Sequence, residues 1–156
     1  MKRPITLVVN GEEWRIDVEP SDTLLEALRD RVGVKSPKAG CERGDCGSCT
    51  VLLDGRTVRS CLVLAVEADG REVTTVEGIG GEGLTPLQRA FHEENAFQCG
   101  FCAPGIVLAA TELLRENPKP TEDEVKEAIS GNLCRCTGYE PIVRAVLRAA
   151  GAEEKR

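Results

Sequence analysis

The stretch CERGDCGSC, residues 41–49, decides how the first half of the chain folds. Its three cysteines are separated by four and two residues, and a fourth cysteine stands alone after a further eleven residues. Because glycine has no side chain, the glycines between the cysteines permit tight turns and a close approach of backbone N–H groups to sulfur. The spacing therefore predicts a loop that gathers four thiolates, here named the first cysteine set: Cys41, Cys46, Cys49 and Cys61.

A C-x4-C-x2-C spacing followed by a distant cysteine is typical of plant-type [2Fe-2S] ferredoxins. Four thiolates around two irons carry excess negative charge, which nearby backbone N–H groups offset. Structural zinc is the alternative, but zinc sites usually pair two short C-x2-C knuckles, whereas the fourth cysteine here stands alone. The first cysteine set therefore favours an iron–sulfur cluster over zinc, with disulfides third.

The second half of the chain holds four more cysteines with the spacing C-x2-C-x31-C-x1-C. Each pair lies at a junction between predicted helices, so packing of the helices can bring the pairs together at one end. This spacing also favours an iron–sulfur cluster, with zinc as the alternative. These residues are named the second cysteine set: Cys99, Cys102, Cys134 and Cys136.

The overall composition excludes several classes of protein. The chain has 156 residues, eight of them cysteine, and a formal net charge of −6. Both halves are acidic, which disfavours nucleic acid as a partner. The apolar runs are far shorter than the roughly 20 residues that span a bilayer. The short apolar run before Asn10 is too small for a signal peptide, so we expect a chain in the reducing cytoplasm, where paired cysteines more often bind metal or do redox work.

Single residues outside the cysteine sets give no catalytic constellation. His92 is the only histidine and cannot supply a catalytic pair, so no catalytic residue is expected. Arg43, Arg59 and Arg135 lie beside or near cysteines, where they either offset cluster charge, meet a partner or are solvated. The charged end, residues 153–156, is expected to be disordered.

Residues 1–77 read as a mixed sheet with one helix. Alternating apolar residues on both sides of Asn10-Gly11 predict a β-hairpin. A capping box of Thr23 and Glu26 predicts a helix that ends at Gly33. Three further strands are predicted over residues 50–53, 61–66 and 72–76.

Residues 78–84, GIGGEGL, separate a region with strand-like patterns from a region with helical patterns. Their glycines fit the dinucleotide-binding pattern G-x-G-x-x-G, but the acidic residue expected about 20 positions later is missing, so we interpret the segment as a linker.

After the linker, apolar residues recur with the spacing of an α-helix. Four helices are predicted: one over about 85–95 with a capping box of Thr85 and Gln88, one over about 104–117, one from the capping box of Thr121 and Glu124, and one after Gly138. Four short helices over residues 85–156 predict a bundle.

Three motifs carry a resemblance to a known family: CERGDCGSC at 41–49, QCGFCAPG at 98–105 and GNLCRCTGY at 131–139. Together they closely resemble the small iron–sulfur subunit of the molybdenum hydroxylases, the relatives of xanthine dehydrogenase, aldehyde oxidoreductase and aerobic carbon monoxide dehydrogenase. The resemblance extends from the first hairpin to about Ala150. It implies an α+β chain, in which a ferredoxin-like β-grasp domain is followed by a four-helix bundle, each holding one [2Fe-2S] cluster.

The resemblance also implies a role and partners. A large subunit binds molybdopterin and acts on the substrate, and electrons pass through the two clusters to FAD on a medium subunit, in an assembly expected to be a dimer of heterotrimers. The second cysteine set then faces molybdenum, Gln98 matches the residue that hydrogen-bonds the pterin, and Cys136 matches the ligand close to it. The residues alone leave two alternatives open: a free-standing two-cluster electron carrier and a zinc-stabilised interaction module.

Overall fold

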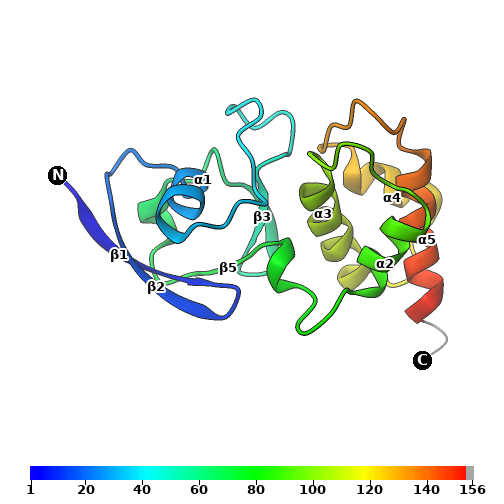
Figure 1. The fold of residues 1–156 in the computed structure, drawn as a ribbon, viewed down its shortest axis with the longest axis horizontal. Helices are drawn as coiled ribbons and strands as arrows, with labels where there is room; N and C mark the ends of the chain where they lie inside the picture. Colours follow the sequence, from blue (N-terminus) through cyan, green and yellow to red (C-terminus); the bar gives the residue numbers. More distant parts are fainter. Residues whose placement is uncertain (154–156) are drawn as a thin grey trace.

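The first half of the chain forms a five-stranded mixed sheet in the computed structural model, which describes residues 1–153 (Figure 1). The strand order is β2-β1-β5-β3-β4, with β1 antiparallel to β2 and parallel to β5. The predicted hairpin is confirmed, with Asn10 and Gly11 in the left-handed conformation that a two-residue turn requires. The strands are β1 (Arg3–Val9), β2 (Glu12–Val18), β3 (Thr50–Leu53), β4 (Arg56–Arg59) and β5 (Glu72–Thr74).

One helical segment packs on this sheet. It begins as α1 (Leu24–Glu26) and continues as a π-helix over Ala27–Val32. The predicted capping box is present: the Glu26 amide donates to Thr23 Oγ1 at 3.2 Å, and the Thr23 amide donates to the Glu26 carboxylate at 2.7 Å. The segment ends at Gly33, which adopts φ 90°. We call α1 and the five strands together the sheet part.

The predicted strand over residues 61–66 was wrong. The strand that returns after the Asp54-Gly55 turn is β4, and the chain then turns so that Cys61 packs against Cys49. Ala65–Ala68 follows as a 3₁₀-helix, in which Ala65 and Ala68 are both fully buried. A 3₁₀-helix places residues i and i+3 on the same side, so these alanines reach the core without a strand.

Four helices form the second half of the chain, here named the helical part (Figure 1). They are α2 (Pro86–Glu93), α3 (Ala103–Glu116), α4 (Glu122–Ile129) and α5 (Glu140–Glu153). The capping boxes of α2 and α4 are confirmed. The four helices share one core that includes Ile106, Val125, Ile129, Ile142 and Val146. The expected disorder beyond Glu153 lies outside the described residues. No helix within residues 1–153 is long and apolar enough to cross a membrane.

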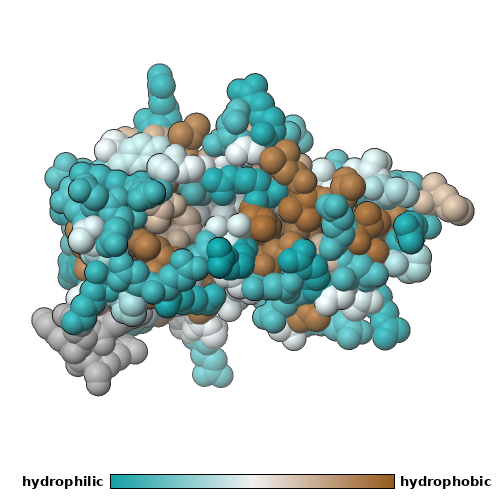
Figure 2. Space-filling model, turned by 180° about the vertical axis from the view of Figure 1, so that it is seen from behind, coloured by the Kyte–Doolittle hydropathy of each residue, from teal (hydrophilic) through white to brown (hydrophobic). Residues whose placement is uncertain are grey.

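The two parts touch directly as well as through residues 78–84. The backbone amide of Thr57 in β4 donates to Glu112 in α3 at 3.2 Å, and Arg56 pairs with the same carboxylate at 3.1 Å. Among the four helices of the helical part, Figure 1 shows α3 nearest to β3. On the opposite side of the molecule, hydrophilic residues cover most of the surface and hydrophobic residues gather mainly over the sheet part (Figure 2).

Candidate metal centres

The connections that carry cysteines lie along one edge of the molecule, at the top of Figure 1. The loop before β3 and the turn after β4 bear the first cysteine set. The connections between α2 and α3 and between α4 and α5 bear the second set. All eight cysteines are free thiols. The fold therefore divides them into the two groups of four that the spacing predicts.

The loop at residues 41–49 surrounds one sulfur with backbone donors. The sulfur of Cys41 accepts hydrogen bonds from the amides of Arg43 at 3.5 Å, Asp45 at 3.3 Å and Cys46 at 3.3 Å. The bonds from Cys46 and Arg43 lower the pKa of the Cys41 thiol to about 6. Hydrogen bonds to the charged form favour it, so this loop is built to hold a thiolate.

Burial has the opposite effect on the other side of the first set. Cys49 and Cys61 are 3% and 8% exposed and pack against Leu25. Burial, followed by the neighbouring Cys49 thiol, raises the pKa of Cys61 to about 11, and the charge of Cys41 contributes to this rise. The four thiols are therefore close enough to change each other's ionisation.

Gly40 shows how closely the backbone fits these sulfurs. A Cβ atom on Gly40 would lie only 2.8 Å from the sulfur of Cys46. Such a contact is shorter than a carbon and a sulfur atom tolerate, so a side chain at this position would displace the sulfur. The loop thus fits a group that holds the Cys46 sulfur in a fixed place.

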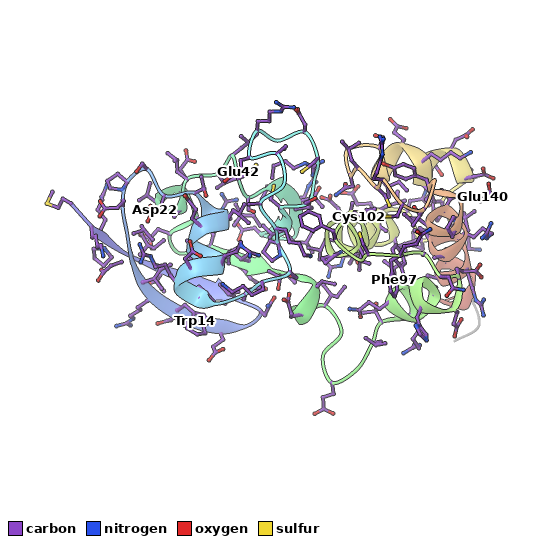
Figure 3. All side chains as sticks on the ribbon, turned by 45° about the horizontal axis from the view of Figure 1, so that its top comes forward. Trp14, Asp22, Glu42, Phe97, Cys102 and Glu140 are labelled. Carbon is purple, nitrogen blue, oxygen red and sulfur yellow. The ribbon has the colours of Figure 1, made fainter. Side chains whose placement is uncertain are left out.

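The second cysteine set is joined in two pairs. The sulfurs of Cys99 and Cys136 lie 3.7 Å apart. The thiols of Cys102 and Cys134 also contact each other, and burial, followed by this contact, raises the pKa of Cys102 to about 12. The hydroxyl of Thr137 donates to the sulfur of Cys134 at 3.1 Å. Figure 3 places Cys102 on the side of the helical part that faces the sheet, far from Glu140.

The pairing of sulfurs suits a binuclear group. In a [2Fe-2S] cluster held by four thiolates, each iron takes two of them. Within residues 1–153 no three His, Cys, Asp or Glu side chains are already arranged around a single metal ion. Instead, Cys99 contacts Cys136, and Cys102 contacts Cys134. The donor set therefore has the chemistry and the pairwise grouping that a [2Fe-2S] cluster uses.

Gln98 lies beside the second set, as its place in the motif suggests. Its side chain is exposed, and Nε2 donates to the carbonyl oxygen of Cys136 at 3.1 Å. Gln98 therefore ties the connection before α3 to the connection before α5.

Sequence reasoning missed several residues that organise the two centres. Asn132 is 2% exposed and hydrogen-bonds into the first cysteine loop. Arg59, whose place near Cys61 left three roles open, is half-buried, and its guanidinium donates to Thr50 Oγ1 at 2.9 Å and to the carbonyl of Gly131 at 2.7 Å. The hydroxyl of Tyr139 accepts from the amide of Cys134 at 2.8 Å. The only available signal was the position of these residues within or beside the cysteine motifs.

Comparisons with known proteins agree with this geometry. Residues 7–78 match the family described as "2Fe-2S iron-sulfur cluster binding domain", and residues 75–147 match the "[2Fe-2S] binding domain". The small subunit of nicotine 6-hydroxylase from Paenarthrobacter nicotinovorans is 52% identical over 147 residues, which are 94% of this chain and 89% of the relative. The chain belongs to the small iron–sulfur subunits of the molybdenum hydroxylases.

Solved structures show that this small subunit has the fold of its relatives. Quinoline 2-oxidoreductase from Pseudomonas putida 86 contains a chain with a TM-score of 0.94 and 48% identity, covering 99% of the small subunit and 97% of that chain. The aldehyde oxidoreductase of Desulfovibrio desulfuricans gives a TM-score of 0.93 and 44% identity, covering 97% of the small subunit but 17% of the longer chain. The same fold therefore occurs both as a separate subunit and as one segment of a longer polypeptide.

Family membership decides between the interpretations that the residues left open. The small subunit carries two [2Fe-2S] domains, and it is an electron-transfer component of a multi-subunit oxidoreductase. The identification of the family and the prediction of iron–sulfur clusters are confirmed. Zinc as the structural metal finds no support in these matches.

Proposed function

We propose that the small subunit passes electrons from a large molybdopterin-binding subunit, through its two cluster sites, to FAD on a medium subunit. The observation that carries this proposal is the division of eight cysteines into two sets of four, one set in each matched [2Fe-2S] domain. Each bound cluster accepts and releases one electron at a time. The chain performs no substrate chemistry of its own.

The ligand assignment follows the two sets. The first set, Cys41, Cys46, Cys49 and Cys61, holds one cluster in a ferredoxin-like β-grasp domain over residues 1–77. The second set, Cys99, Cys102, Cys134 and Cys136, holds the other in a four-helix bundle domain over residues 85–156, after a linker at 78–84. The convergent amides at Cys41 and the paired sulfurs of the second set support this assignment.

The exposure of the second set supports its orientation toward molybdopterin. Cys99, Cys136 and Gln98 are all exposed at one edge of the helical part. The amide of Gln98 has two N–H groups, and its bond to Cys136 uses one of them. One N–H group and the side-chain oxygen thus remain to hydrogen-bond a pterin held by the large subunit, next to the Cys136 ligand.

Substrate choice belongs to the large subunit in this proposal. Three relatives that are 52%, 41% and 41% identical to this subunit are named for nicotine, xanthine and aldehyde, respectively. One conserved electron-transfer component therefore serves complexes with different substrates. We place the complex in the cytoplasm, as a dimer of heterotrimers.

Metal analysis tests the cluster assignment. Purified protein should contain about four iron and four acid-labile sulfide per chain. Cys134→Ser should abolish one of the two EPR signals of the reduced protein, and Cys46→Ser should abolish the other. Stoichiometric zinc with little iron, or survival of both signals in either variant, would overturn the assignment.

Affinity capture from the native host tests the partners. The tagged small subunit should bring down one flavoprotein and one large molybdopterin protein. Capture of neither would refute the subunit proposal and favour a free-standing electron carrier.

A further inference from the structure

The two cysteine loops meet at one backbone hydrogen bond. The amide of Leu133 donates to the carbonyl oxygen of Cys46 at 2.9 Å. Leu133 is bonded directly to Cys134, so the hydrogen bond links Cys46 of the first cysteine set to the neighbour of Cys134 in the second set. The two sets are thus joined by covalent bonds and one hydrogen bond.

A buried side chain beside this hydrogen bond connects the same two loops. Asn132 is 2% exposed, and its Nδ2 donates to the carbonyl of Gly47 at 3.1 Å and to Thr50 Oγ1 at 3.2 Å. Both N–H groups of the Asn132 amide are therefore used in hydrogen bonds to the first loop. Gly47 and Leu133 directly follow Cys46 and Asn132, so the side-chain contact and the backbone contact position the same segments.

Close packing leaves no room for the loops to move closer together. A Cβ atom on Gly47 would lie 2.5 Å from the carbonyl oxygen of Gly131. A Cβ atom on Gly105, at the start of α3, would lie 2.5 Å from the carbonyl oxygen of Gly47. Arg59 adds a bond from β4 to Gly131 at 2.7 Å. The contact is thus built from three glycines, the buried amide of Asn132 and the guanidinium of Arg59.

We propose that Asn132 is a positioning residue that fixes the distance and orientation between the two cluster-binding loops. The inference rests on the ligand assignment proposed above. With both clusters bound, exchange between them would oxidise one by one electron and reduce the other by one, with no proton moved and no bond broken. Asn132 acts through the loops and ligates nothing itself.

Asn132→Asp tests the role of the amide. A carboxylate has no N–H group and would face the carbonyl of Gly47, so the loops should separate. We expect iron and sulfide contents equal to those of the unmodified protein, but a reduced or lost magnetic splitting between the two reduced clusters by EPR. Electron equilibration between the sites after flash reduction should also slow. Asn95→Asp is the matched control, because Asn95 is exposed and its left-handed backbone tolerates aspartate.

Gly105→Ala tests the spacing without removing a hydrogen-bonding group. Alanine is favourable inside a helix, so α3 itself is not weakened, but the new methyl group must push the Gly47 carbonyl away. The same loss of magnetic splitting is expected, since a dipolar interaction falls with the cube of the separation. Gly151→Ala is the control, because a Cβ atom there meets nothing within 4 Å.

The outcomes separate this inference from the proposed function. Unmodified protein that lacks about four iron per chain contradicts the ligand assignment. Full clusters with unchanged splitting and equilibration in both Asn132→Asp and Gly105→Ala overturn the positioning role alone. Loss of iron from both variants, with both controls intact, also overturns it, because these residues would then hold the fold and not the spacing.

Discussion

The side chain of Gln98 donates a hydrogen bond from Nε2 to the carbonyl oxygen of Cys136, at 3.1 Å. This contact joins the two connections that bear the second cysteine set, and it leaves part of the amide for the pterin contact proposed above. In the complex, Gln98→Met should slow reduction of the second site by substrate while iron content stays the same. The free energy of unfolding should fall by about 0.5–1.5 kcal/mol, the usual effect of losing one hydrogen bond. Rapid-freeze EPR and urea unfolding measure the two effects.

Gln88→Met is the matched control for this prediction. Gln88 accepts a hydrogen bond from the Thr85 amide at 2.8 Å in the capping box of α2, away from the cysteines. Its loss should lower stability by a similar amount and leave the rate of reduction unchanged. Equal slowing in both variants would show that Gln98 acts through stability only.

Gly40→Ala should empty the first site selectively. The new methyl group would meet the Cys46 sulfur at 2.8 Å, and a sulfur bonded to iron cannot rotate away. Iron should fall from about four to about two per chain, with loss of one EPR signal. Gly83→Ala, where a Cβ atom meets nothing within 4 Å, should keep both signals. Full iron in Gly40→Ala would show that the loop is looser than its packing indicates.

Cys41 should be more reactive than Cys61 and Cys102 in the metal-free protein. Its pKa of about 6 makes it mostly thiolate at pH 7, whereas Cys61 and Cys102, with pKa values of about 11 and 12, stay protonated. Alkylation of Cys41 should rise with pH and level off near pH 7, while the other two should react above about pH 10. Mass spectrometry of iodoacetamide-treated protein measures this order. In urea, alkylation of all three thiols should follow one pH profile centred at about pH 8.5. If the three thiols also shared one profile in the folded protein, the prediction would be contradicted.

Tyr139→Phe should destabilise the helical part. The hydroxyl accepts from the Cys134 amide at 2.8 Å and donates to the Asn132 carbonyl at 3.2 Å, so its removal leaves two partly buried backbone groups unpaired. The expected loss in free energy of unfolding is about 1–3 kcal/mol. Thr111→Val removes a hydroxyl that bonds only within α3, to Val107, and should cost less than about 1 kcal/mol. Equal losses in the two variants would refute the role of Tyr139 in the loop.

The features that the sequence predicts correctly are local. The turn at Asn10-Gly11 and the capping boxes at Thr23, Thr85 and Thr121 depend on residues that are only a few positions apart. The local order of residues is therefore enough to specify them. The cysteine motifs are equally local, which is why the division into two sets could be read directly.

The errors arise where distant contacts decide the structure. The apolar run over residues 61–66 suits a strand, but Cys61 must reach Cys49 and the alanines that follow are buried from a 3₁₀-helix. The strand that does form, β4, is polar, because it lies at the edge of the sheet and faces α3 through Thr57. Nothing local to Asn132 shows that its side chain enters a loop 85 positions away.

The contact between the two loops consists largely of main-chain atoms on the side of the first loop. Asn132 and Leu133 bind the carbonyl groups of Gly47 and Cys46, which belong to the main chain. Substitution of the exposed side chains at the outer rim, Glu42 and Asp45, therefore leaves this recognition intact. The side chains of the rim can therefore change to suit a different partner surface without altering the geometry between the two loops.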